Sequence, residues 1–210
     1  MFPFDVILFD VGGVLLTNGW DTRERALAAQ HFHLNLPDLE AKHQSVFSAW
    51  ERGKITRDDY LDAAVFCRPR GFSRDEFFNF VLAQSQWLPN GAIGILKHLA
   101  ASNNYMLGAL NNEARETNEY RLTTFGLRQY FDVVLSSCYL GLRKPDLAIY
   151  QRALDILGRP AERILFIDDR AENVAGALNA GMKAIQFKND EQLRGELANL
   201  GLPEKVAPES

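Results

Sequence analysis

Short hydrophobic runs alternate with amphipathic stretches along most of the chain. Residues 6–9 are four apolar residues rich in β-formers, too few for a stable helix, and they indicate a strand buried on both faces. Comparable runs further along predict more short strands, at residues 105–110, 133–135, 163–167 and 183–187.

Helical patterns accompany these later strands. We expect helices over residues 91–100, 113–125, 146–157, 171–180 and 190–200. Four of them end at a glycine, which is the usual left-handed cap of a helix. Strands that alternate with helices imply right-handed crossovers and a parallel sheet. The predicted fold class is therefore α/β, a Rossmann-like parallel sheet with helices on both faces.

The stretch after the first strand differs, because residues 20–86 carry helix signals and no convincing strand. Residues 37–53 are amphipathic, and Thr56 and Ser73 each begin a segment with acids in its first turn. We expect an inserted all-helical cap over the edge of the sheet. The predicted division is a core domain of residues 1–17 and 88–205, a cap of residues 18–87, and a flexible tail of residues 206–210.

Composition narrows the class of partner. The chain has 210 residues, 47% of them hydrophobic, and a formal net charge of −4 without any basic run, which argues against nucleic acid or a membrane surface. Acids interrupt the short apolar N-terminal run, so no signal peptide is expected. Cys67 and Cys138 lack metal-ligand spacing and indicate free thiols in a reducing compartment, so the expected location is cytoplasmic.

Polar side chains stand just after the expected strands, where ligands bind in open α/β sheets. In chain order they are Asp10, Asn111 and Asn112, Lys144, and Asp168 and Asp169. The carboxylates of Asp10 and Asp169 suit a hard cation whose remaining positions are filled by water. The two amides and the lysine suit the oxygens of a phosphate.

Each of these residues also has a purely structural interpretation. Asp10 followed by Gly12-Gly13 is good turn chemistry, Asp168 can cap the next helix, and Lys144-Pro145 can be an exposed turn. The pair Asn111-Asn112 can cap a helix. One shared site explains all of them in their order along the chain, and separate turns and caps do not.

Four motifs together resemble the haloacid dehalogenase superfamily, in the branch with a small helical cap inserted after the first motif. They are Phe9-Asp10-Val11-Gly12-Gly13-Val14, Leu110-Asn111-Asn112, Gly141-Leu142-Arg143-Lys144-Pro145 and the stretch from Phe166 to Asn173. Members of this superfamily are mostly magnesium-dependent phosphatases, with some dehalogenases and mutases.

The resemblance implies a role for each motif residue. Asp10 is expected to be the nucleophile that forms an aspartyl-phosphate, and to bind Mg²⁺ together with the Gly12 carbonyl and Asp169. Asp168 is expected to act on the metal through water or to orient Lys144.

The remaining implied roles concern the substrate, a small phosphorylated metabolite. Lys144 is expected to neutralise charge on the phosphate and on the nucleophile. Asn111 and backbone amides near Asn112 are expected to hold the transferring phosphoryl group, and Asn173 to brace the loop. Candidates for specificity in the cap are Trp20, Trp50, Glu51 and Arg52, although the tryptophans suit a core role better.

Two positions depart from the family pattern. Gly12 replaces the usual acid that protonates the leaving group, a function worth roughly 10²–10⁴-fold in rate. Asn111 replaces the usual serine or threonine but keeps a hydrogen-bond donor. The loss at Gly12 predicts a preference for good leaving groups. It also leaves two alternatives open, a non-catalytic phosphoester-binding sensor and a haloacid dehalogenase.

Overall fold

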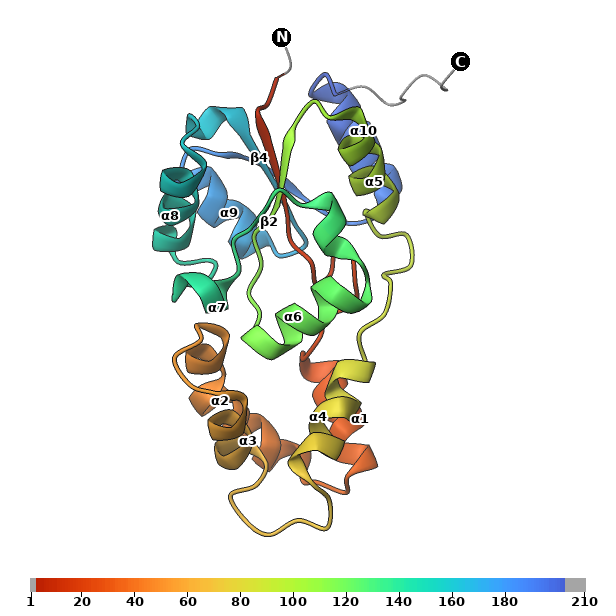
Figure 1. Ribbon diagram of the computed structural model, residues 1–210, viewed down its shortest axis with the longest axis vertical. Helices are drawn as coiled ribbons and strands as arrows, with labels where there is room; N and C mark the ends of the chain where they lie inside the picture. Colours follow the sequence, from red (N-terminus) through yellow and green to blue (C-terminus); the bar gives the residue numbers. More distant parts are fainter. Residues whose placement is uncertain (1–2, 203–210) are drawn as a thin grey trace.

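The computed structural model describes residues 3–202, and its centre is a five-stranded parallel sheet in the order β3-β2-β1-β4-β5 (Figure 1). The strands are β1 (Val6–Phe9), β2 (Met106–Ala109), β3 (Val133–Val134), β4 (Ile164–Asp168) and β5 (Lys183–Gln186). The predicted α/β, Rossmann-like fold is therefore confirmed, and the predicted strands differ from the observed ones only at their ends. The expected tail, residues 206–210, lies outside the described residues.

The central strand β1 sets the register of the sheet. Phe9 is opposite Ala109 of β2 on one side and Ile167 of β4 on the other. Asp10 continues the ladder, since its N–H donates to the Ile167 carbonyl at 2.8 Å. Residues that follow these three strands consequently meet at one edge of the sheet.

Helices cover both faces of the sheet, and alternate residues of β1 supply both hydrophobic cores. Ile7 and Phe9 point to the face covered by α5 (Ile93–Ser102) and α10 (Asp190–Asn199). Val6 and Leu8 point to the opposite face, where α8 (Leu147–Leu157) and α9 (Ala171–Asn179) pack. A strand buried on both faces needs an unbroken apolar run, which explains why the pattern at residues 6–9 predicted it.

Four helices form a separate bundle beyond the carboxyl edge of the sheet (Figure 1, lower half). They are α1 (Thr22–His31), α2 (Leu36–Glu51), α3 (Arg57–Ala64) and α4 (Arg74–Ala83), and we call them the cap. The cap has its own buried cluster, which includes Leu61, Val65 and Phe77. Thr56 and Ser73 cap α3 and α4 in the capping boxes that the sequence indicates.

Four short or weakly patterned elements were not predicted. Helix α1 has no apolar stripe, although Asp21 caps it in a box with Glu24 that the sequence shows. Helix α7 (Ser137–Leu140) has only one turn, and 3₁₀ helix η2 (Ala161–Arg163) is shorter still. Helix α6 (Arg115–Thr124) was predicted two residues too early, and 3₁₀ helix η1 (Leu127–Tyr130) follows it.

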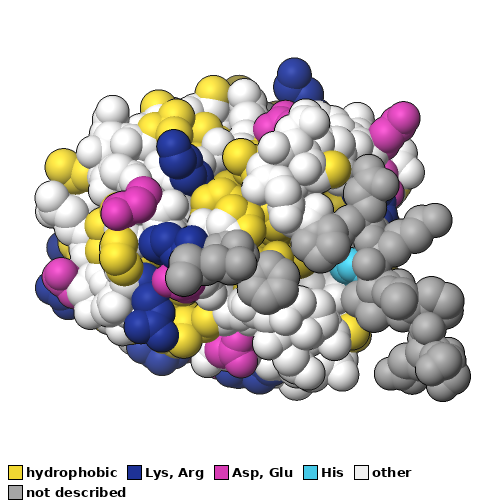
Figure 2. Space-filling view, turned by 90° about the horizontal axis from the view of Figure 1, so that it is seen from above, with side chains coloured by type: hydrophobic (Ala, Val, Ile, Leu, Met, Phe, Trp, Pro, Cys, Tyr) yellow, Lys and Arg dark blue, Asp and Glu magenta, His cyan; other side chains and the backbone are white. Residues whose placement is uncertain are grey.

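Charged side chains of both signs are interspersed on the end of the molecule that carries the chain termini. Figure 2 shows hydrophobic side chains in the middle of this face, with lysines, arginines, aspartates and glutamates scattered around them. Among residues 3–202, no helix is both long and apolar enough to cross a bilayer.

The cap rests on the core through the turn that ends α2. Gly53 in this turn has φ +64°, and a Cβ atom there would lie 2.5 Å from the carbonyl oxygen of Cys138 in α7. Next to it, Arg52 forms an ion pair of 2.7 Å with Asp146 of the core. The absence of a side chain at residue 53 thus lets cap and core approach each other.

The substitution Gly53→Ala should lower the free energy of unfolding by about 2 kcal/mol, because the left-handed conformation disfavours alanine and the new methyl group meets Cys138. Urea unfolding measures the loss. Gly71→Ala is the matched control, since it lies in another cap loop and its Cβ would meet no atom within 4 Å. Equal stability of the two variants would contradict the prediction.

Candidate active site

A buried lysine joins two of the carboxylates at the sheet edge. Lys144, in the loop between α7 and α8, places Nζ 3.0 Å from Asp10 Oδ2 and 2.6 Å from Asp168 Oδ2. Asp169 completes the group, since one oxygen from each of the three carboxylates lies within 4.8 Å of the others. The structure thus brings together four of the residues singled out in the sequence.

Asp168 is held by protein groups on both of its oxygens. Besides Lys144, it accepts hydrogen bonds from the Arg170 N–H at 2.8 Å and from Asn173 Nδ2 at 3.0 and 3.1 Å. Burial acts to raise the pKa of Asp168, but the Lys144 ammonium outweighs it and holds the pKa below its usual value. These contacts favour a role in orienting Lys144, with Asn173 bracing the loop.

The other two carboxylates are less fully compensated than Asp168, although Lys144 also pairs with Asp10. Burial raises the pKa of Asp10 to about 8 although Lys144 opposes the shift, and burial together with the charge of Asp168 raises the pKa of Asp169. The Gly12 carbonyl accepts no backbone hydrogen bond from residues 3–202. Carboxylate and carbonyl oxygens are the ligands that hard divalent cations prefer, so this set fits Mg²⁺.

Gly13 allows the first loop to approach the acidic pair. Its φ is +71°, and a Cβ atom at this residue would lie 2.3 Å from Asp169 Oδ2. Any side chain here would push the Asp169 carboxylate away from Asp10. This lack of space explains why the second glycine of the first motif stands at residue 13.

The two asparagines after β2 play different parts. Asn111 is buried and donates from Nδ2 to Asn118 Oδ1 at 2.9 Å, which leaves one of its two amide hydrogens free. The Asn112 side chain is engaged with the backbone of Lys144, donating to its carbonyl at 2.9 Å and accepting from its N–H at 2.8 Å. Asn112 thus positions Lys144, and only its main-chain N–H, unpaired among the described residues, remains for a ligand.

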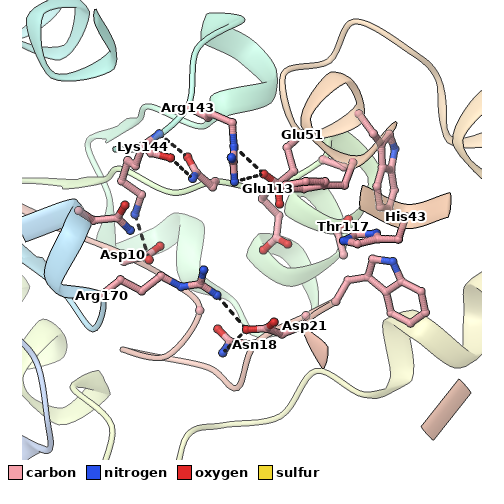
Figure 3. Close-up of a pocket in the computed structure, with 18 of the residues that line it drawn as sticks. Asp10, Asn18, Asp21, His43, Glu51, Glu113, Thr117, Arg143, Lys144 and Arg170 are labelled. Carbon is pink, nitrogen blue, oxygen red and sulfur yellow. Dashed lines mark hydrogen bonds and ion pairs between the residues drawn. The ribbon is translucent and has the colours of Figure 1, made fainter. Parts of the chain in front are cut away.

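A cavity of about 340 Å³ lies between these residues and the cap (Figure 3). Asp10, Lys144 and Arg170 line it from the core, and His43 and Glu51 line it from the cap. Its lining carries several charges of each sign, which suits a polar ligand.

Ion pairs close the cavity across the boundary between core and cap. Arg143 places two guanidinium nitrogens 3.0 and 2.9 Å from Glu51 Oε2, and Arg170 lies 2.8 Å from Asp21 (Figure 3). Burial raises the pKa of Glu51, and Arg143 opposes that shift. Of the specificity candidates, Glu51 therefore lies at the cavity, whereas Arg52 pairs with Asp146 outside the lining.

The two candidate tryptophans belong to the cap core and also reach the cavity. Trp50 is buried and stacks on Tyr60 at 4.1 Å between ring centroids. Trp20 Nε1 donates to the Tyr60 hydroxyl at 2.6 Å, and His43 Nδ1 lies 2.8 Å from the same oxygen. Burial lowers the pKa of His43 to about 3, so its imidazole is neutral.

Comparison with known proteins decides the family. The sequence model for haloacid dehalogenase-like hydrolase matches residues 4–181, which include the first four strands and the whole cap. The chain belongs to the haloacid dehalogenase-like hydrolases. The resemblance drawn from the four motifs is thereby confirmed, and the helices α1–α4 agree with the predicted cap subgroup.

Relatives within the family include named phosphatases. Flavin mononucleotide hydrolase 1 of Arabidopsis thaliana is 31% identical over 166 residues, which cover 78% of this chain and 65% of that protein. Sesquiterpene phosphatase astK of Aspergillus oryzae is 26% identical, with 94% of this chain and 96% of that protein covered. The chain spans 65% of the length of the flavin mononucleotide hydrolase. It spans 30% to 49% of the length of three other curated relatives.

A solved structure of the same family shows the shared fold. A family enzyme of Bacteroides thetaiotaomicron superimposes with a TM-score of 0.78 at 20% identity, covering 92% of this chain and 98% of its own. The same enzyme has been solved in complex with magnesium and inorganic phosphate.

Several residues of this hydrolase site received no role from the sequence, among them Glu113, Arg121 and Ser137. Glu113 and Arg121 line the cavity as a buried ion pair of 2.5 Å. Ser137 accepts a hydrogen bond from the Glu113 N–H at 2.9 Å and donates one to the Glu51 carbonyl at 2.7 Å. The position of Glu113 directly after Asn111-Asn112 was the available signal, but it was assigned to the following helix.

Replacing Lys144 by methionine should cost about 3–5 kcal/mol of unfolding free energy at pH 8, because it leaves buried carboxylates unpaired. The loss should shrink at pH 5. In the native protein the pKa of Asp168 is lowered, so the ionised carboxylate stabilises the fold at any pH above the ordinary pKa of an aspartate. Without Lys144, burial raises the pKa of Asp168. Protonation at pH 5 then removes the buried charge and with it part of the stability loss.

Urea unfolding in chelator at both pH values checks this expectation. The control is Lys183→Met, because Lys183 is an exposed lysine on β5. A Lys144→Met loss that does not depend on pH would contradict the argument.

Proposed function

We propose that this hydrolase is a Mg²⁺-dependent phosphatase of a small phosphorylated metabolite, acting through an aspartyl-phosphate on Asp10. The observation that carries the proposal is the placement of Lys144 between Asp10 and Asp168, with Asp169 within reach of the same point. A nucleophilic carboxylate beside a fixed ammonium is the arrangement that phosphoryl transfer requires.

In the first half of the reaction, an Asp10 oxygen attacks phosphorus and the bond to the leaving oxygen breaks. Lys144 neutralises the charge of the transferring group. The second amide hydrogen of Asn111 and the main-chain N–H groups of Gly12 and Asn112, which pair with no described residue, are the available donors for its equatorial oxygens.

Asp10, Asp169 and the Gly12 carbonyl would hold Mg²⁺, with Asp168 orienting Lys144 beside them. When bound, Mg²⁺ supplies positive charge that the carboxylates lack and that the transferring phosphoryl group needs. The complex of the Bacteroides enzyme with magnesium and inorganic phosphate supports this assignment.

Two further observations support a small phosphorylated substrate. The cavity of about 340 Å³ is at the lower end of the range for small-molecule sites. Relatives named as phosphatases cover nearly the whole chain, as astK does. The cap side chains around the cavity would contact the leaving group and so select it.

Purified protein should release phosphate from members of a metabolite phosphate library when Mg²⁺ is present, and chelation should abolish the release. Asp10→Asn should reduce turnover by at least about 10³-fold, because an amide cannot act as the nucleophile. A malachite-green assay measures both effects. Phosphoester binding without phosphate release would favour the sensor alternative, and release of halide from a 2-haloacid in chelator would favour the dehalogenase.

Aryl, acyl or anomeric sugar phosphates should be hydrolysed about 10²-fold faster than alkyl phosphates of similar size, because Gly12 cannot protonate the leaving oxygen. A plot of log kcat/KM against leaving-group pKa measures this preference as a steep negative slope. Alkyl and aryl phosphates that react equally fast would contradict it.

A further inference from the structure

The position of the missing acid faces a charged side chain. A Cβ atom on Gly12 would lie 3.0 Å from Asn18 Oδ1 and 3.6 and 3.8 Å from the terminal nitrogens of Arg121. A carboxylate at residue 12 would therefore project toward the Arg121 guanidinium. In this chain that guanidinium already has an acid as its partner.

Glu113 is that partner. Its Oε2 lies 2.5 Å from Arg121 Nη1, and both side chains are buried, with residue exposures of 9% and 2%. Arg121 is fixed from the other side as well, since its Nη2 donates to the Thr17 carbonyl at 2.5 Å. Glu113 lies in the loop between β2 and α6, and Arg121 lies in α6, so both members of the pair belong to the core.

One carboxylate oxygen of Glu113 remains available. Oε2 accepts from Arg121, whereas Oε1 accepts no hydrogen bond from residues 3–202. Figure 3 shows the Glu113 carboxylate directed into the cavity that Asp10 also lines. The Ser137 hydroxyl holds the Glu113 main chain at 2.9 Å, which fixes the base of the side chain.

Most other titratable groups around the cavity are paired, and Glu172, which also lines it, is exposed to solvent. Asp168 is saturated by Lys144 and by two further donors, and Asp21 caps α1 and pairs with Arg170. Glu51 receives two nitrogens of Arg143. His43 is bonded to the Tyr60 hydroxyl.

We propose that Glu113 is the general base of the second half-reaction, the hydrolysis of the phosphoaspartate, in place of the acid that Gly12 lacks. This inference rests on the proposed phosphatase function. A water oxygen attacks phosphorus, the bond between phosphorus and the Asp10 oxygen breaks, and Asp10 leaves as a carboxylate. The proton of the water passes to Glu113 Oε1 and then to solvent, and inorganic phosphate is released.

The ion pair makes Glu113 a base for this step and not an acid for the first one. Glu113 Oε2 is engaged by the Arg121 guanidinium, and Oε1 is left as an acceptor for the proton of a water molecule. The first half-reaction therefore proceeds without proton donation and requires a good leaving group. The second half-reaction has a base and does not depend on the leaving group.

Rapid-quench kinetics with p-nitrophenyl phosphate and Mg²⁺ separate the two halves. Glu113→Gln should release one equivalent of nitrophenol per site at the wild-type rate, and its steady-state rate should then be about 10²-fold below wild type. Acid-quenched protein should carry the mass of one phosphoryl group. Glu116→Gln is the matched control, since this acid lies three residues away and is bonded to no described residue.

Equal slowing of burst and steady state in folded Glu113→Gln would overturn the proposal, as would a steady-state rate equal to that of wild type. If Glu113→Gln fails to fold, Glu113→Asp takes its place, because it keeps the charge beside Arg121 and withdraws the base by one methylene. It should show the same burst followed by slow turnover, and wild-type turnover would overturn the proposal. A wild-type chain that releases no nitrophenol would instead overturn the phosphatase function itself.

Discussion

One ammonium group balances the acids on which the whole site depends. Lys144 is buried at the carboxyl edge of the sheet, and its Nζ contacts Asp10 after β1 and Asp168 at the end of β4. Unpaired, these buried carboxylates would cost several kcal/mol of folding free energy. The Asn112 side chain and the Asn173 amide hold the lysine and its partner, so charge balance and geometry are set together.

At this edge of the sheet, the core and the cap contribute different parts of the site. The sheet brings Asp10, Lys144 and Asp169 together through parallel register, in which neighbouring strands end side by side. The cap supplies the opposite wall of the cavity and is tied down by ion pairs such as Arg143 with Glu51. In the proposed phosphatase, chemistry would depend on the sheet, and selection of the leaving group would depend on the helical cap.

Much of this arrangement could be predicted from the sequence, because the polar residues of the site follow the predicted strands in order along the chain. Asp10, Lys144 and Asp169 were placed correctly near one another since topology alone brings them to one edge. The Asn112 contact with Lys144 and the Glu113 pair with Arg121 could not be predicted, because they depend on rotamers and on where α6 begins. Helix α1 escaped notice because its alanines form no apolar stripe.

The Ser137 hydroxyl forms a hydrogen bond across the boundary between core and cap. Ser137 Oγ donates to the carbonyl of Glu51, the last residue of α2, and accepts from the main chain at Glu113. Separation of the cap would remove the acceptor on Glu51 and leave the Glu113 carbonyl, 3.3 Å away, as the acceptor for this hydroxyl. The position of Glu113, the base that we propose, is consequently coupled to the end of α2, so a movement of the cap would be transmitted to the base.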